Sequence, residues 1–230
     1  MPNSNACLCV ALDYEDRRSF LATVKNFEDL DLVVKIGLRL LPKLRTEDFE
    51  YLKEQGIPFF IDAKLYDIPS QVKSAVHAWA KLGASYLTVH LSSGRSVLMA
   101  AQEAAKQTDM TILGVSVLTS MDDAELKELG VEANCKKQVR RLVSLGLSCG
   151  IKSFVSSVAE VQAIKEIVPN AFCVCPGIRL AGESQHSDQK RSYTVAEAVS
   201  KGVSMLVVGR SVYQADNPRA VAKKIISEIS

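Results

Sequence analysis

The residues of this sequence best suited to chemistry are an aspartate and a lysine at the end of a short apolar run. Asp62 and Lys64 stand two positions apart at the end of residues 58–63, and Asp67 follows shortly after. Side chains two residues apart on a β-strand point to the same face of the sheet, so Asp62 and Lys64 are expected to lie together. Asp67 adds a second carboxylate to this set.

Two further charged residues have an equivalent position at the end of an apolar run. Lys35 lies near the end of residues 32–36, and Asp13 directly follows residues 6–12. Buried charges cost on the order of several kcal/mol each unless they are paired, so such a cluster is seldom retained for stability alone. A lysine between carboxylates stays protonated, because opposite charges favour its charged form, and is suited to donate a proton to a carbanion. The structural alternative is an ordinary salt bridge at a strand end.

Two segments that combine glycine with arginine indicate a phosphate site. They contain Pro176, Gly177 and Arg179 in the first, and Gly209 and Arg210 in the second. Glycine lets the backbone approach an anion closely, and the planar guanidinium group of arginine matches phosphate oxygens. Gln189, in the long irregular piece 177–191, is placed to close over such a ligand. The structural alternative is that Arg179 caps a helix.

The segments that position these residues alternate between β-branched apolar runs and amphipathic stretches of helical period. The predicted strands are residues 6–12, 32–36, 58–63, 86–90, 111–117, 152–156, 172–175 and 205–208. The predicted helices include residues 44–53, 71–82, 97–106 and 135–145. Strands that are each followed by a helix indicate a parallel sheet covered by helices, and eight strands close into a (β/α)₈ barrel.

The expected fold is therefore α/β, a single (β/α)₈ TIM barrel formed by residues 1–230 as one catalytic domain. No linker-like or low-complexity block divides the chain, and such a barrel usually has roughly 250 residues. Active sites of this fold lie at the carboxyl ends of the strands. The charged candidates fall at such ends, and Thr119 and Ser120 follow the fifth predicted strand. We expect all of them on one rim.

Composition argues against several classes of function. The net charge of +2 leaves no broad basic surface for nucleic acid or for an anionic membrane. No apolar run reaches the about 18 residues of a spanning helix. Residues 1–5 are short and polar and lack the basic region and the cleavage site of a secretory signal, so a cytoplasmic protein is expected.

The six cysteines invite a metal or disulfide interpretation. There is no C-x-x-C pair, but Cys7 with Cys9, and Cys173 with Cys175, lie two apart inside apolar runs. Each pair shares a strand face and could in principle meet a metal ion. The interpretation adopted is that they are small buried hydrophobes in a reducing cytosol, with no metal bound.

Along essentially its whole length the sequence resembles the orotidine 5'-phosphate decarboxylase family. The most specific string is D-x-K-x-x-D-I-P, present here from Asp62 to Pro69. The other matching strings, in the family's order and at similar spacing, are ALD at 11–13, VKIG at 34–37, VLTSM at 117–121, CPGIR at 175–179, DQKR at 188–191 and VGR at 208–210.

The resemblance implies a homodimeric barrel that converts orotidine 5'-monophosphate to UMP and carbon dioxide without a metal or an organic cofactor. By this likeness Lys64 donates the proton to C6 of the pyrimidine, and Lys35, Asp62 and Asp67 complete its charged network. Asp67 and Ile68 enter the site of the partner subunit. The other substrate contacts implied are Asp13 and Lys35 for the ribose, Thr119 or Ser120 for the pyrimidine edge, and Pro176, Arg179, Gln189, Gly209 and Arg210 around the phosphate.

Two positions depart from the family pattern. Gln71 stands where many relatives carry threonine, so a contact between Gln71 and the substrate does not follow from the resemblance alone. The segment between Arg179 and Gln189 is about one residue longer than in typical bacterial members, so Gln189 is assigned by its D-Q-x-R context.

Two rival functions are considered. Sugar-phosphate aldolases and decarboxylases of the same superfamily also use D-x-K-x-x-D, but with Mg²⁺ and an acidic residue at the end of the second strand. Lys35 stands there in this chain and would repel the metal. The other rival is a catalytically inactive barrel that binds nucleotide, and the retention of every charged member of the network disfavours it.

Overall fold

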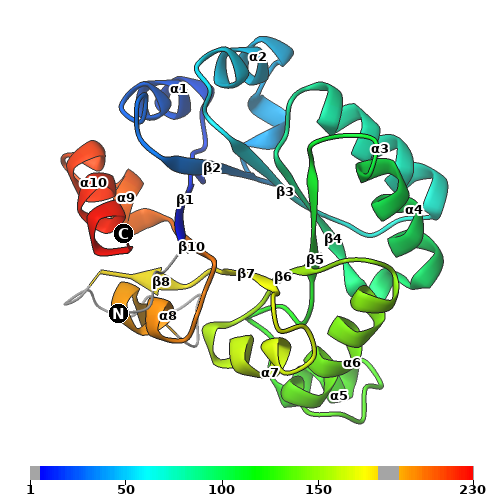
Figure 1. Ribbon diagram of the computed structural model, residues 1–230. Helices are drawn as coiled ribbons and strands as arrows, with labels where there is room; N and C mark the ends of the chain where they lie inside the picture. The colour runs from blue at the N-terminus through cyan, green and yellow to red at the C-terminus, as the bar shows by residue number, and fades with distance from the viewer. Residues whose placement is uncertain (1–5, 181–191, 230) are drawn as a thin grey trace.

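A computed structural model describes residues 6–180 and 192–229 of the chain. Its centre is a closed barrel of parallel strands with helices around the outside (Figure 1). The barrel strands are β1 (Cys7–Ala11), β2 (Leu32–Gly37), β3 (Phe59–Leu65), β4 (Tyr86–His90), β5 (Thr111–Val115), β6 (Ser153–Val155), β7 (Phe172–Cys175) and β10 (Met205–Val208). The predicted (β/α)₈ barrel is confirmed, and β4, β7 and β10 have the predicted bounds.

Helices follow the strands along the chain and cover the outer face of the barrel. The α-helices are α1 (Arg17–Lys25), α2 (Thr46–Glu54), α3 (Pro69–Lys81), α4 (Arg95–Ala105), α5 (Asp123–Glu128), α6 (Cys135–Ser148), α7 (Val161–Lys165), α8 (Val195–Ser200), α9 (Arg210–Tyr213) and α10 (Pro218–Ile229). Short 3₁₀ turns are η1 (Leu41–Lys43), η2 (Leu91–Ser93) and η3 (Val158–Glu160). None of the helices in the described part of the chain is long and apolar enough to cross a membrane.

The strand order is that of sequential βα units, closed by pairing β1 with β10. In the register of β2 and β3, Lys35 is opposite Phe60 and Gly37 is opposite Asp62. Parallel pairing brings the carboxyl ends of all these strands to one rim. The charged candidates at those ends are thereby gathered from segments that are far apart in the sequence.

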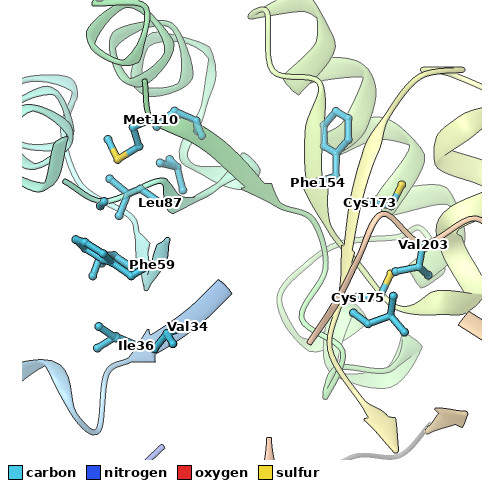
Figure 2. Close-up of a cluster of buried hydrophobic side chains, with 14 of the residues drawn as sticks. Val34, Ile36, Phe59, Leu87, Met110, Phe154, Cys173, Cys175 and Val203 are labelled. Atoms are coloured by element: carbon cyan, nitrogen blue, oxygen red, sulfur yellow. The ribbon is translucent and has the colours of Figure 1, made fainter. Parts of the chain in front are cut away.

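The alternation of side chains along each strand builds two apolar layers. Val33 and Phe60 belong to the small interior cluster, together with Cys9 and Leu113. Their neighbours point outward into the larger layer between strands and helices. Figure 2 shows part of this larger layer, in which the labelled side chains are Val34, Ile36, Phe59, Leu87, Met110, Phe154, Cys173, Cys175 and Val203.

The sequence predicts an irregular segment over residues 177–191, and this prediction is wrong for the first residues of the segment. Ile178–Arg179 forms the short strand β8, which pairs in parallel with β9 (Tyr193–Thr194). Gly177 has a φ of 82°, a left-handed conformation that glycine adopts without strain, and it turns the chain from β7 into β8. Residues 181–191, which include Gln189, lie outside the described residues.

Candidate active site

A chain of alternating charges occupies the rim of the barrel at the ends of β2 and β3. The Nζ atom of Lys35 lies 3.1 Å from Oδ2 of Asp62, and the Nζ atom of Lys64 lies 2.8 Å from Oδ1 of the same carboxylate. Asp13, after β1, places its Oδ1 atom 3.6 Å from the Nζ of Lys35. The side chains of Lys35 and Asp62 are each 12% exposed, whereas that of Lys64 is 33% exposed. Of the two lysines, Lys64 therefore has the more exposed side chain.

The charged forms of Lys35 and Asp62 are stabilised by the opposite charges beside them. Burial alone would lower the pKa of Lys35, but the carboxylates of Asp62 and Asp13 outweigh burial and raise it above its usual value. Burial alone would raise the pKa of Asp62, but the ammonium groups of Lys35 and Lys64 hold it below its usual value. Both groups are therefore charged at neutral pH.

The backbone at Lys64 departs from regular strand geometry. Its φ is +47°, in the left-handed region, and the register of β3 with β4 shifts between Ile61 and Leu65. For a residue other than glycine this conformation costs roughly 1–2 kcal/mol. Such strain is concentrated at functional sites, where it aims a side chain. Asp62 and Lys64 do meet, as predicted, but through this irregularity of β3 rather than through the plain alternation of a strand.

A cavity of about 400 Å³ opens at this rim. The predicted residues that line it are Asp13, Lys35, Asp62, Lys64, Thr119, Pro176, Arg179, Gly209 and Arg210. Apolar side chains of the barrel interior, such as Phe60 and Val207, form its floor. A concave site with an apolar floor and a few convergent charged groups is typical of a small-molecule site.

The side of the cavity formed by β8 and the start of α9 carries the predicted phosphate residues. Arg179 is 7% exposed, and its Nε atom has no hydrogen-bond partner among residues 6–180 and 192–229. Arg210 is the first residue of α9 and follows Gly209. A buried donor without a partner is costly, so an anion that accepts from Arg179 would remove that cost.

Four predicted residues are exposed rather than part of the described cavity lining. They are Asp67, Ile68, Gln71 and Ser120. Oδ1 of Asp67 accepts a hydrogen bond from the N–H of Ile68 at 2.7 Å, and the side chain of Ile68 is 60% exposed. The expectation that Asp67 packs against Lys35, Asp62 and Lys64 is not met within one chain. Asp67 lies in the loop between β3 and α3, where its side chain is exposed.

Sequence reasoning missed three residues of the site. Arg39 and Tyr213 line the cavity, and Arg39 has its NH1 atom 3.5 Å from Oε1 of Glu15. Thr88 is fully buried beneath the charged residues and contacts both Lys64 and Asp62. The available signal for Thr88 was a polar residue inside the apolar run of β4, next to the strand that carries Asp62.

The fold and the charged rim define the protein as a (β/α)₈-barrel with a lysine–aspartate site of a kind suited to proton transfer. The model of the orotidine 5'-phosphate decarboxylase / HUMPS family matches residues 6–225. The chain belongs to this family.

The relatives extend the match over nearly the whole chain. An orotidine 5'-phosphate decarboxylase of Dichelobacter nodosus is 36% identical over 226 residues, which is 96% of this chain and 98% of that protein. An orotidine 5'-phosphate decarboxylase of Neisseria meningitidis is 36% identical over 227 residues, which is 97% of this chain and 92% of that protein. The crystal structure of orotidine 5'-phosphate decarboxylase from Lactobacillus acidophilus matches with a TM-score of 0.86 at 27% identity, covering 98% of this chain and 99% of that one.

Proposed function

We propose that this protein decarboxylates orotidine 5'-monophosphate to UMP and carbon dioxide, the last step of pyrimidine nucleotide synthesis. The observation that carries the proposal is the Lys35–Asp62–Lys64 chain of charges at the wall of the cavity, in a member of this family. The relatives named as orotidine 5'-phosphate decarboxylases support the same substrate.

In the reaction, the bond between C6 and the carboxylate breaks and its electron pair stays on C6, in the plane of the ring. The ammonium group of Lys64 stabilises that charge electrostatically and then gives C6 a proton. Carbon dioxide and UMP leave, and Lys64 recovers its proton from water. Asp62 stands near the departing carboxylate and holds Lys64 through the 2.8 Å contact, so that the ammonium group needs no reorganisation.

The remaining groups bind the substrate at a distance from C6. Arg179, Gly209, Arg210 and Gln189 hold the phosphate with Pro176 beside them, Asp13 and Lys35 hold the ribose hydroxyls, and Thr119 or Ser120 reads the pyrimidine edge. The buried Nε of Arg179 supports the phosphate assignment, and Thr119 is favoured over Ser120 because it lines the cavity. Binding energy from the phosphate can be used to order the site around the reacting carbon.

The proposed reaction uses neither a metal nor an organic cofactor. Lys35 places an ammonium group between the carboxylates of Asp13 and Asp62, where a metal-using relative would need ligands. A divalent cation at that position would be repelled by Lys35 and would compete with it for both aspartates. This contact argues against the Mg²⁺-dependent aldolase function.

The active protein is proposed to be a homodimer in which Asp67 and Ile68 enter the site of the partner subunit, with Gln71 nearby. The exposure of Asp67 supports this, because a carboxylate of the network is otherwise left at the surface. Large apolar side chains exposed in the same loop, Tyr66 at 65% and Ile68 at 60%, also favour burial against a second copy.

We also propose that residues 1–230 act as one catalytic domain in the cytoplasm. The coverage of more than nine tenths of the relatives supports one domain. The six cysteines are free thiols, and Cys9, Cys149, Cys173 and Cys175 are buried, which fits a reducing compartment.

The test is an assay of the purified protein with orotidine 5'-monophosphate in the presence of EDTA. The proposal requires formation of UMP at a rate equal to that without EDTA. A requirement for Mg²⁺ would support the aldolase alternative, and binding of UMP without turnover would support a non-catalytic nucleotide-binding barrel.

A further inference from the structure

Thr88 is a polar residue in the interior of the barrel. It is the third residue of β4, and its residue exposure is 0%. Tyr86, two residues earlier on the same strand, packs against the interior cluster. Because side chains two apart on a strand share a face, Thr88 also points into the barrel, one step nearer the rim.

The Thr88 hydroxyl joins two parts of the charged site. Its Oγ1 accepts a hydrogen bond from the backbone N–H of Lys64 at 2.8 Å. Its own hydrogen has two acceptors in reach, Oδ1 of Asp62 at 3.1 Å and the carbonyl oxygen of Ile61 at 3.4 Å. The carboxylate is closer and charged, and a charge-assisted bond is the stronger one.

The hydroxyl sits where the ladder between β3 and β4 is interrupted. Ile61 is paired with Leu87, and the next pair is Leu65 with Val89. Thr88 alone therefore faces the bulge that contains Asp62 and Lys64. Its hydroxyl gives the N–H of Lys64 a partner in the left-handed conformation, and it orients the carboxylate oxygen that also accepts from the Nζ of Lys64 at 2.8 Å.

We propose that Thr88 is a positioning residue for the decarboxylation, whose hydroxyl fixes the Lys64 backbone and the Asp62 carboxylate relative to each other. This inference rests on the proposed function. Thr88 lies beneath Lys64 and Asp62 and acts through them. The positioning requires both roles of its hydroxyl, which accepts from the N–H of Lys64 and donates to the carboxylate of Asp62. A side chain of the same shape without the hydroxyl would leave the N–H of Lys64 unpaired and would allow Lys64 and Asp62 to shift.

The experiment compares Thr88→Val, Thr88→Ala and Thr88→Ser with the wild-type protein. Valine keeps the shape, alanine removes the hydroxyl without crowding, and serine keeps the hydroxyl. Thr108→Val is the matched control, because the Thr108 hydroxyl likewise accepts from a backbone N–H, that of Met110, and donates to a second group, the carbonyl of Ala105, at the opposite end of the barrel. For each protein kcat and KM with orotidine 5'-monophosphate, Kd for UMP and the circular dichroism spectrum are measured.

The proposal predicts that Thr88→Val and Thr88→Ala lower kcat by about ten- to hundredfold while Kd for UMP changes by less than about threefold. Thr88→Ser recovers most of kcat, and Thr108→Val keeps it. The proposal is wrong if folded Thr88→Val or Thr88→Ala has wild-type kcat, if serine loses as much as valine, or if neither valine nor alanine yields a folded protein. A wild-type protein inactive on orotidine 5'-monophosphate would instead overturn the proposed function.

Discussion

The ammonium group of Lys64 lies 2.8 Å from the carboxylate of Asp62, although the backbone of Lys64 has the left-handed φ of +47°. A regular strand would not need this conformation to place two side chains on one face. The bulge changes the direction in which Lys64 leaves the strand, and the ion pair and the Thr88 hydroxyl hold it there. The cost of the strained backbone is thus offset by contacts that also aim the ammonium group at the cavity.

Replacement of Arg179 tests the phosphate end of the site. Arg179→Ala is expected to lower kcat/KM for orotidine 5'-monophosphate by about a hundredfold, since a buried charged donor contributes about 1.5–3 kcal/mol to each hydrogen bond. Binding of uridine, which has no phosphate, should not change. Arg179→Lys should restore less than half of the lost binding free energy, because an ammonium group lacks the planar fork. Arg140→Ala, which removes an ion pair with Glu166 on the outer helices, is the control. An equal loss for uridine and for the nucleotide would contradict the assignment.

The pH dependence of stability tests the charge of Asp62. Its folded pKa lies below the ordinary value of 3.8. The stability that its ion pairs contribute is therefore complete above about pH 4 and is lost as the pH falls through the lowered folded pKa. Urea unfolding should show that Asp62→Asn costs about 3 kcal/mol from pH 5 to pH 8, and that this difference shrinks below pH 4.

Asp109→Asn is the matched control for the same unfolding series, because Asp109 is exposed before β5 at the other end of the barrel. Its substitution should change the free energy of unfolding by less than about 0.5 kcal/mol at each pH. A cost of Asp62→Asn that grows below pH 4 would mean that the carboxylate is not held charged by Lys35 and Lys64.

Mixing two inactive variants tests whether Asp67 serves the partner subunit. Lys64→Ala and Asp67→Ala are each expected to be inactive as homodimers. After the two are unfolded together and refolded, half of the dimers are mixed, and each mixed dimer contains one site with both Lys64 and Asp67. The mixture should regain about a quarter of the wild-type activity per chain. Size-exclusion chromatography checks that dimers form, and a mixture that stays inactive although mixed dimers are present would place Asp67 in the site of its own chain.

The fold was predictable because its signals are local and repeat. Each barrel strand contains a short apolar run, and the amphipathic helices between the strands have clear periods, so the bounds of β4, β7 and β10 could be predicted directly. The pairing of β8 with β9 was not predictable. It joins residues on either side of a long segment, and two-residue strands carry no periodicity.

The part of the site that could be predicted consists of residues at the carboxyl ends of strands. Asp13, Lys35, Asp62 and Lys64 could be placed together because parallel strands share one rim. The left-handed backbone of Lys64 and the role of Thr88 could not be predicted, because both depend on an irregular register between β3 and β4. The exposure of Asp67 in the loop between β3 and α3 could not be predicted either, because a short loop has no periodic pattern.

The most direct test of the central claim is the turnover of orotidine 5'-monophosphate by Lys64→Ala and by the wild-type protein, both in EDTA. The wild type should form UMP at full rate, whereas the variant should lose at least about a thousandfold in kcat, as expected for removal of both the proton donor and the charge next to C6. Circular dichroism and UMP binding should show that the variant remains folded with an intact nucleotide site. A folded Lys64→Ala variant that retains kcat within tenfold of the wild type would contradict the account.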